Sequence, residues 1–242
     1  MRGARILFNT YWIRFSLGEL THEKAVDNSK TLIKAAVDAG IQRIVHVSIT
    51  NPSKDAPTAY FRGKAIVEEE IVNSGIPYAI LRPAVFFGND GILINTIAWM
   101  LRRFPVLPVM GDGNYKIQPV FVGDLARLAV DAARRDENMI IDAVGPEIFT
   151  YNELVAVIGE KIGRRAPLIH LPPLLGYCGS RVLGFMLRDV ILTRDEIRSL
   201  MANYLVSADP PTATTPFTEW LSENADSLGR KYISELGKHY RK

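Results

Sequence analysis

The chain has 242 residues, of which 48% are hydrophobic and 23% charged, and its formal net charge at pH 7 is +3. This is enough for one large or two small domains with a buried core, and so mild a charge does not favour a nucleic-acid-binding protein. The single cysteine excludes an intrachain disulfide and suits a reducing cytosol, so we expect a cytoplasmic protein. No apolar run reaches membrane-spanning length, so no membrane span is expected.

Strands and helices are predicted to alternate over the first 145 residues. Strands are expected at 5–9, 44–49, 77–81 and 139–144, and helices at 21–39, from about residue 59 to 73, at 91–103 and at 124–134. A further strand pair, 106–110 with 116–121, is expected around the turn Gly111-Asp112-Gly113-Asn114. The strands are continuously apolar rather than alternating, which predicts a parallel sheet covered by helices on both faces.

The first eighteen residues can be interpreted in two ways. They contain three arginines and no acidic residue, which is also typical of a mitochondrial transit peptide. We favour the alternative, a strand at 5–9 followed by a loop, because compositional targeting signals are weak.

Beyond Gly145 the chain is predicted to be mostly helical. Capping boxes starting at Thr150 and Thr193 predict two helix starts, a strand is possible at 168–171, and the apolar segment 172–192 is expected to be a helix packed on the core or over the substrate. A proline-rich linker follows at 210–216, and then a basic helix from about Arg230. We therefore expect a core at 1–145, a helical substrate-side portion at 146–209, and a linker with a C-terminal helix at 210–242.

A lysine lies on the helix face that should be buried. Tyr60, Lys64, Val67 and Ile71 are spaced by four, three and four residues and share that face. An ammonium beside a phenol favours the phenolate, which suits the phenol for proton transfer at a carbonyl or alcohol. Ser48 lies twelve residues before Tyr60, at the carboxyl end of a strand, where ligands bind in open α/β sheets.

Less specific interpretations exist for these residues. With nine tyrosines and ten lysines in the chain, the chance occurrence of one Tyr-x-x-x-Lys pair is nearly a coin toss, and Lys64 could extend from the rim of the core towards water. His46, in mid-strand, is interpreted as a packed core residue rather than as a base. No Cys/His/Asp cluster has the spacing of a metal site, so no metal is expected.

Ser48, Tyr60 and Lys64 resemble the catalytic triad of the short-chain dehydrogenase/reductase superfamily, at that superfamily's spacing. Three flanking stretches resemble its extended and atypical branches, which include NAD-dependent epimerases/dehydratases, NmrA-like proteins and the group related to the 39 kDa subunit of respiratory complex I. These stretches are Val26-Asp27-Asn28-Ser29-Lys30-Thr31, Leu81-Arg82-Pro83-Ala84-Val85-Phe86-Phe87-Gly88 and Phe121-Val122-Gly123-Asp124-Leu125-Ala126.

The resemblance implies a site and a cofactor. Asn28 would complete a catalytic tetrad, and the segment from Pro83 to Val85 would lie against the nicotinamide of NAD or NADP. The other residues expected at the cofactor are Asn9, Thr10 and Tyr11, with Tyr60 and Lys64.

The chain also departs from this family pattern. The Gly-rich turn that normally holds the pyrophosphate is absent, since the one G-x-G, at Gly111, lies in a turn between two apolar runs. The pattern aligns as though the first three strand–helix units were missing. We therefore expect a partial Rossmann-like doubly wound parallel sheet with a mostly helical C-terminal portion, and weak dinucleotide binding.

The leading functional hypothesis is an NAD(P)-dependent oxidoreductase or epimerase-type protein that acts on a small-molecule substrate. The alternatives are a non-catalytic nucleotide-sensing or complex-assembly subunit, and a truncated gene product. Strand 5–9, without its usual neighbour, should be a sheet edge with three apolar residues and no guarding charge. A homodimer through that edge, or aggregation, is therefore expected.

Overall fold

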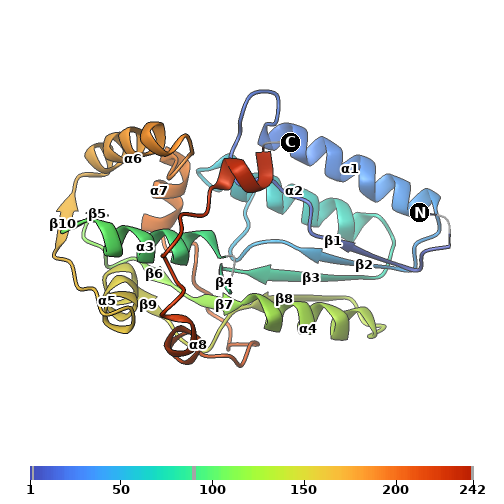
Figure 1. The fold of residues 1–242 in the computed structure, drawn as a ribbon. Coiled ribbons are helices and arrows are strands. Elements are labelled where there is room, and N and C mark those ends of the chain that lie inside the picture. Colours follow the sequence, from blue (N-terminus) through green and yellow to red (C-terminus); the bar gives the residue numbers. More distant parts are fainter. Residues whose placement is uncertain (2, 89–90, 241–242) are drawn as a thin grey trace. The chain divides into compact units, whose positions relative to one another are not determined.

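The computed structural model describes residues 1, 3–88 and 91–240, and these form two compact units (Figure 1). The first unit contains Met1–Ala84, Gly123–Val144 and Ser207–Ala213, and the second contains the rest of the described chain. The chain therefore leaves the first unit and returns to it twice.

The first unit is built on a four-stranded parallel sheet in the order β1-β2-β3-β8, with β1 at Ile6–Asn9, β2 at Arg43–Val47, β3 at Tyr78–Pro83 and β8 at Met139–Ala143. Helices α1 (His22–Asp38) and α2 (Ala59–Asn73) pack with Ile44 and Ile80 on one face. Helix α4 (Val122–Ala133) packs with Val45, Ala79 and Leu81 on the other. The predicted α/β class with a parallel sheet covered on both faces is confirmed.

Local sequence signals explain where the helices of this unit begin and end. The Thr21 hydroxyl accepts a hydrogen bond from the Lys24 N–H at 3.2 Å and caps α1, and Gly40 ends it with φ at +69°. Helix α2 begins after Pro57 and Thr58 and ends at Asn73, as the sequence predicted.

The segment Ser207–Ala213 returns to β8, one edge of this sheet. The Thr212 and Ala213 N–H groups donate to the Val144 carbonyl at 3.2 and 3.0 Å. The Ser207 hydroxyl donates to the Asp142 carboxylate at 2.5 Å. The opposite edge is β1, whose Ile6 and Phe8 are exposed while Leu7 packs on the core.

The second unit combines five helices with three pairs of short strands. The helices are α3 (Ile92–Arg103), α5 (Tyr151–Lys161), α6 (Pro173–Leu187), α7 (Arg194–Met201) and α8 (Phe217–Asn224). The strand pairs are β4 (Val85–Phe87) with β7 (Pro119–Phe121), β5 (Leu107–Met110) with β10 (Leu168–Leu171), and β6 (Lys116–Ile117) with β9 (Phe149–Thr150). Both predicted capping boxes are present, at Thr150 and at Thr193.

Two sequence-based expectations for this unit are wrong. The segments 106–110 and 116–121 do not pair with each other, because β5 pairs in parallel with the distant β10, while β6 and β7 pair with β9 and β4. The helix expected from about Arg230 is only a short π-helical turn at Leu236–Tyr240. Its place is taken by an anchored segment, since the Asp189 carboxylate accepts the N–H groups of Glu235 and Leu236.

Across the described parts of the chain, none of the helices has both the length and the apolar composition needed to cross a bilayer.

Candidate functional site

Lys64, on α2, is a buried cation with two partners. Its side chain is 2% exposed, and its Nζ donates a hydrogen bond to the Val47 carbonyl at 2.8 Å. The Trp12 ring centroid lies 4.8 Å from the same nitrogen, in cation–π geometry. Burial lowers the pKa of the ammonium from 10.5 to about 7, and the Glu68 carboxylate opposes that shift. Lys64 therefore sits near the midpoint of its titration at neutral pH.

Ser48 follows β2 directly and is next to the residue that Lys64 contacts. Its hydroxyl is buried and makes no hydrogen bond to the described chain, and the same is true of the Asn9 side-chain nitrogen at the end of β1. Both lie at the carboxyl edge of the parallel sheet, where ligands bind in open α/β folds. Two polar groups at this edge therefore have unused hydrogen-bonding capacity.

His46 is fully buried opposite Asn9 in the β1–β2 register. Neither of its ring nitrogens has a hydrogen-bond partner in the described chain. Burial, together with the nearby Lys64 charge, holds the pKa of His46 well below 6.5. It is a neutral core residue, as the sequence suggested.

Tyr60 lies one helical turn before Lys64 on α2 and is half-buried. Its ring contacts Trp12 edge-on at 5.9 Å between centroids and His22 edge-on at 5.8 Å, and Phe61 at 5.4 Å. The phenol is thus held within an aromatic cluster from α2, the start of α1 and the loop after β1.

Trp12 is a site residue that the sequence interpretation missed. A Cβ added at Gly63 would lie 2.8 Å from Trp12 Cη2, so the indole packs on α2 where that helix has no side chain. The signal in the sequence was Gly63 itself, a helix-interior glycine between Tyr60 and Lys64, because such a glycine often marks a close approach.

The remaining predicted residues occupy different places. The Asn28 side-chain nitrogen donates to the Tyr11 hydroxyl at 2.9 Å, and the Asn9 carboxamide oxygen accepts the Tyr11 N–H at 3.1 Å. Thr10 is exposed in the same loop. Pro83 ends β3 in the first unit, whereas Val85 begins β4 in the second. The first unit thus brings all of the predicted side chains except Val85 to the carboxyl side of its sheet.

An ion pair between β3 and α2 stabilises this arrangement. Arg82 on β3 bonds the Glu68 carboxylate through Nε at 3.0 Å and through Nη2 at 2.5 Å. Glu68 lies one turn after Lys64 on α2 and is buried. The pair joins the helix that carries Tyr60 and Lys64 to the middle of the sheet.

The sequence profile of the NmrA-like family matches residues 6–176. The chain belongs to the NmrA-like family. It is 28% identical over 204 residues to a protein of Arabidopsis thaliana named NADH dehydrogenase [ubiquinone] 1 alpha subcomplex subunit 9, mitochondrial; the match covers 80% of this chain and 50% of that protein. The chain therefore spans about half the length of this curated relative.

Solved structures show the same fold. An NADPH-dependent quinone oxidoreductase from Escherichia coli, complexed with NADPH, has a TM-score of 0.69 at 19% identity, over 92% of this chain and 77% of the other. The triphenylmethane reductase of Citrobacter sp., complexed with NADP(H), has a TM-score of 0.67 at 18% identity, over 93% and 77%. The fold is thus the Rossmann-like fold of NAD(P)-binding reductases.

The polar groups of this NmrA-like chain fit the nicotinamide end of a dinucleotide. Lys64 keeps donor capacity beyond its bond to Val47, and the Ser48 hydroxyl and the Asn9 side-chain nitrogen have no partner in the described chain. The Trp12 ring covers one side of the ammonium. A ligand approaching Lys64 from that side therefore has to displace the indole.

Proposed function

We infer that this NmrA-like protein binds NAD or NADP and uses Tyr60, Lys64 and Ser48 for acid–base chemistry at a carbonyl or alcohol of a small molecule. The observation that supports this most is the buried Ser48 hydroxyl, which has no partner in the described chain and lies one residue from the carbonyl that Lys64 contacts. Leaving a buried hydroxyl unsatisfied costs about 1–3 kcal/mol. A substrate oxygen that accepts a hydrogen bond from this hydroxyl would recover that free energy.

Each residue then has a distinct task. Ser48 donates to the substrate oxygen and orients it, and Tyr60 gives a proton to that oxygen or removes one. Protonated Lys64 favours the phenolate form of Tyr60 and offers further N–H donors to a ribose hydroxyl. Asn28 holds the loop after β1 through Tyr11. The bound dinucleotide would supply or accept the hydride.

A second candidate function is that of an accessory or assembly subunit that keeps the nucleotide fold without turnover. The contact between Trp12 and Lys64 Nζ favours it, since the indole occupies one side of the group that would meet a ribose. The Arabidopsis relative, which is named as a subunit of an NADH dehydrogenase, also favours this candidate.

Calorimetric titration with NADPH and with NADH tests binding first. NADPH oxidation with a simple quinone and an aromatic ketone as probes then tests turnover. Tyr60→Phe removes only the hydroxyl, so it should lower turnover by about a hundredfold or more while the melting temperature is kept. Tyr78→Phe, a tyrosine at the opposite end of the sheet, is the matched control and should leave turnover unchanged.

Four outcomes separate the candidates. Binding with turnover that depends on Tyr60 supports the enzyme. Binding without turnover supports the accessory role. Turnover that is equal in wild type and Tyr60→Phe contradicts the role given to Tyr60. No binding of either dinucleotide at millimolar concentration contradicts the enzyme and any accessory role that depends on a nucleotide.

A further inference from the structure

Helix α6 packs on its unit through small residues. Gly176, Ser180 and Gly184 are spaced by four and form its buried side. A Cβ at Gly176 would lie 2.8 Å from Met110 Cγ, and one at Gly184 would lie 2.6 Å from the Asp189 carbonyl oxygen. The helix therefore approaches its neighbours closely and has no room there for a large side chain.

The large apolar residues of α6 point outward instead. The exposed fraction is 87% for Phe185, 73% for Met186 and 64% for Val182, and Leu174 and Leu175 near the start of the helix are more than half exposed. At 100° per residue these five positions, with the exposed Cys178, fall within one face of the helix. We call this set of six residues the apolar face. This pattern is the reverse of an ordinary surface helix, whose large apolar residues face the core.

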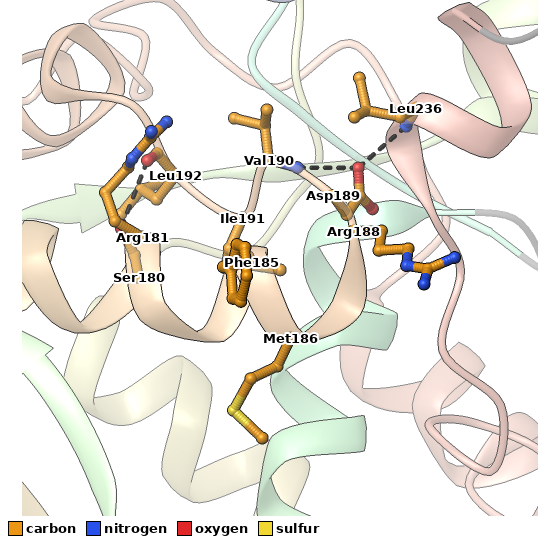
Figure 2. Close-up of a pocket in the computed structure, with 11 residues that line it drawn as sticks. Ser180, Arg181, Phe185, Met186, Arg188, Asp189, Val190, Ile191, Leu192 and Leu236 are labelled. Atoms are coloured by element: carbon orange, nitrogen blue, oxygen red, sulfur yellow. Dashed lines mark hydrogen bonds between the residues drawn. The ribbon is translucent and has the colours of Figure 1, made fainter.

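Basic residues predominate in the sequence before and within α6. From Lys161 to Arg188 the sequence contains five lysines or arginines and no acidic residue. Arg181 and Arg188 stand on either side of Phe185 and Met186 (Figure 2). The next acidic residue, Asp189, is buried, and its carboxylate accepts hydrogen bonds from the Tyr232 hydroxyl and three backbone N–H groups.

A hollow of about 640 Å³ adjoins the end of the apolar face. It is lined by residues of α6, by the segment from Asp189 to Leu192 that follows this helix, and by Leu236 (Figure 2). Val190, Ile191 and Leu192 line it together with Phe185 and Met186, and Arg181 and Arg188 belong to the same lining. Apolar walls combined with guanidinium groups suit an amphiphile with an anionic head and a hydrocarbon chain.

We propose that α6 is a membrane-docking helix that lies in the headgroup–acyl boundary of an anionic bilayer. The bilayer offers an apolar phase to the apolar face and negative charge close to the flanking arginines. A second copy of the chain matches less well, because two such faces would bring arginines together without an acidic residue between them. The helix has 15 residues and lies on the surface rather than crossing it.

Co-sedimentation with vesicles tests this docking directly. The wild-type protein should bind phosphatidylglycerol/phosphatidylcholine vesicles, and phosphatidylcholine alone far less. Phe185→Ser with Met186→Ser leaves the charge unchanged and should lower binding about tenfold or more. Arg181→Gln with Arg188→Gln should lower binding to the anionic vesicles by about fivefold per arginine.

The matched control replaces Val130 and Ile148 by serine, since both are exposed apolar residues outside α6. This variant should bind vesicles as the wild type does. Phe185→Trp adds a reporter that does not depend on the double variants, because its emission should shift to the blue on vesicles and be quenched by brominated lipid chains.

Several results would overturn the proposal. These are wild-type protein that stays in the supernatant at low salt, α6 variants that bind as well as the control, and indole emission of the Phe185→Trp variant that lipid leaves unchanged. A wild-type dimer in light scattering that Phe185→Ser with Met186→Ser dissociates, in protein that does not bind vesicles, would assign the face to a second copy instead.

Discussion

Replacing Gly63 by alanine tests the packing of Trp12 on α2 with one added methyl group. That carbon would lie 2.8 Å from Trp12 Cη2, 3.1 Å from Trp12 Cζ2 and 3.2 Å from Val26 Cγ2. Non-bonded carbons are at their best separation near 3.5–4.0 Å, so the methyl group does not fit unless the indole moves.

Two effects of opposite sign decide the stability of this variant. Alanine is better than glycine in a helix interior by about 1 kcal/mol. Overpacking typically costs about 1–3 kcal/mol. We expect overpacking to exceed the helix-propensity gain, because two ring carbons and a β-branched methyl group crowd the same point. The net loss in the free energy of unfolding should be about 1 kcal/mol.

Removing the indole should reverse the sign of the stability change that Gly63→Ala causes. In a Trp12→Ala background the two close ring contacts are gone and Val26 Cγ2 stays at 3.2 Å, so Gly63→Ala should be neutral or stabilising by up to about 1 kcal/mol. Urea unfolding of the four proteins, followed by circular dichroism, closes a double-mutant cycle with an expected coupling of about 1–3 kcal/mol.

Gly179→Ala is the matched control, since a Cβ at this other helical glycine meets nothing within 4 Å. It should stabilise both backgrounds equally. A coupling between positions 12 and 63 below about 0.5 kcal/mol would show that the two sites are independent. That result would contradict the packing of Trp12 against α2, and with it the contact between the Trp12 ring and Lys64.

Three further predictions concern the first unit. Because burial lowers the pKa of Lys64 to about 7, the folded protein releases this proton near pH 7, while the unfolded chain holds it to about pH 10.4. Between these values the unfolded state binds more protons, so the free energy of unfolding of the wild type should rise from pH 7 to 9 relative to that of Lys64→Met. Urea unfolding at several pH values measures this, and a difference that stays constant with pH would contradict it. Glu68→Gln leaves the partly buried Arg82 without its carboxylate partner and should lower the free energy of unfolding by about 1–3 kcal/mol. The double variant Glu68→Gln with Arg82→Met should recover part of that loss in thermal melts. Equal losses in the single and the double variant would argue that the ion pair contributes nothing. If β1 pairs with a second copy, light scattering should give a dimer mass that Phe8→Lys reduces to the monomer and Val130→Lys does not; a monomeric wild type would refute that pairing.

Local signals made most of the secondary structure predictable. A capping box is completed within four residues, so Thr150 and Thr193 determine the starts of α5 and α7 whatever surrounds them. The continuously apolar strands β2 and β3 likewise identified a sheet buried on both faces. The positions of Tyr60, Lys64 and Ser48 relative to that sheet followed from these elements.

Features that depend on distant contacts could not be predicted. Pairing of β5 with β10 joins residues about 60 positions apart, and the sequence of neither strand identifies its partner. The anchoring of the C-terminal segment depends on Asp189, which is more than 40 residues from the N–H groups it accepts. Helix α6 was expected to pack on the core or over the substrate, and its exposed apolar face was not foreseen, because an apolar helix does not reveal from its own sequence which side its neighbours occupy.

The returning segment Ser207–Ala213 has a consequence for synthesis on the ribosome. The contacts of this segment with Asp142 and Val144, at the β8 edge of the sheet, can form only when these residues have emerged, up to about 70 residues after Val144. At about 5–20 residues per second the nascent chain waits roughly 3–14 seconds with that edge uncovered. The β1 edge is open during the same interval. A ribosome that stalls between these points therefore presents a sheet with two open edges, the form of this chain most exposed to aggregation and most in need of a chaperone.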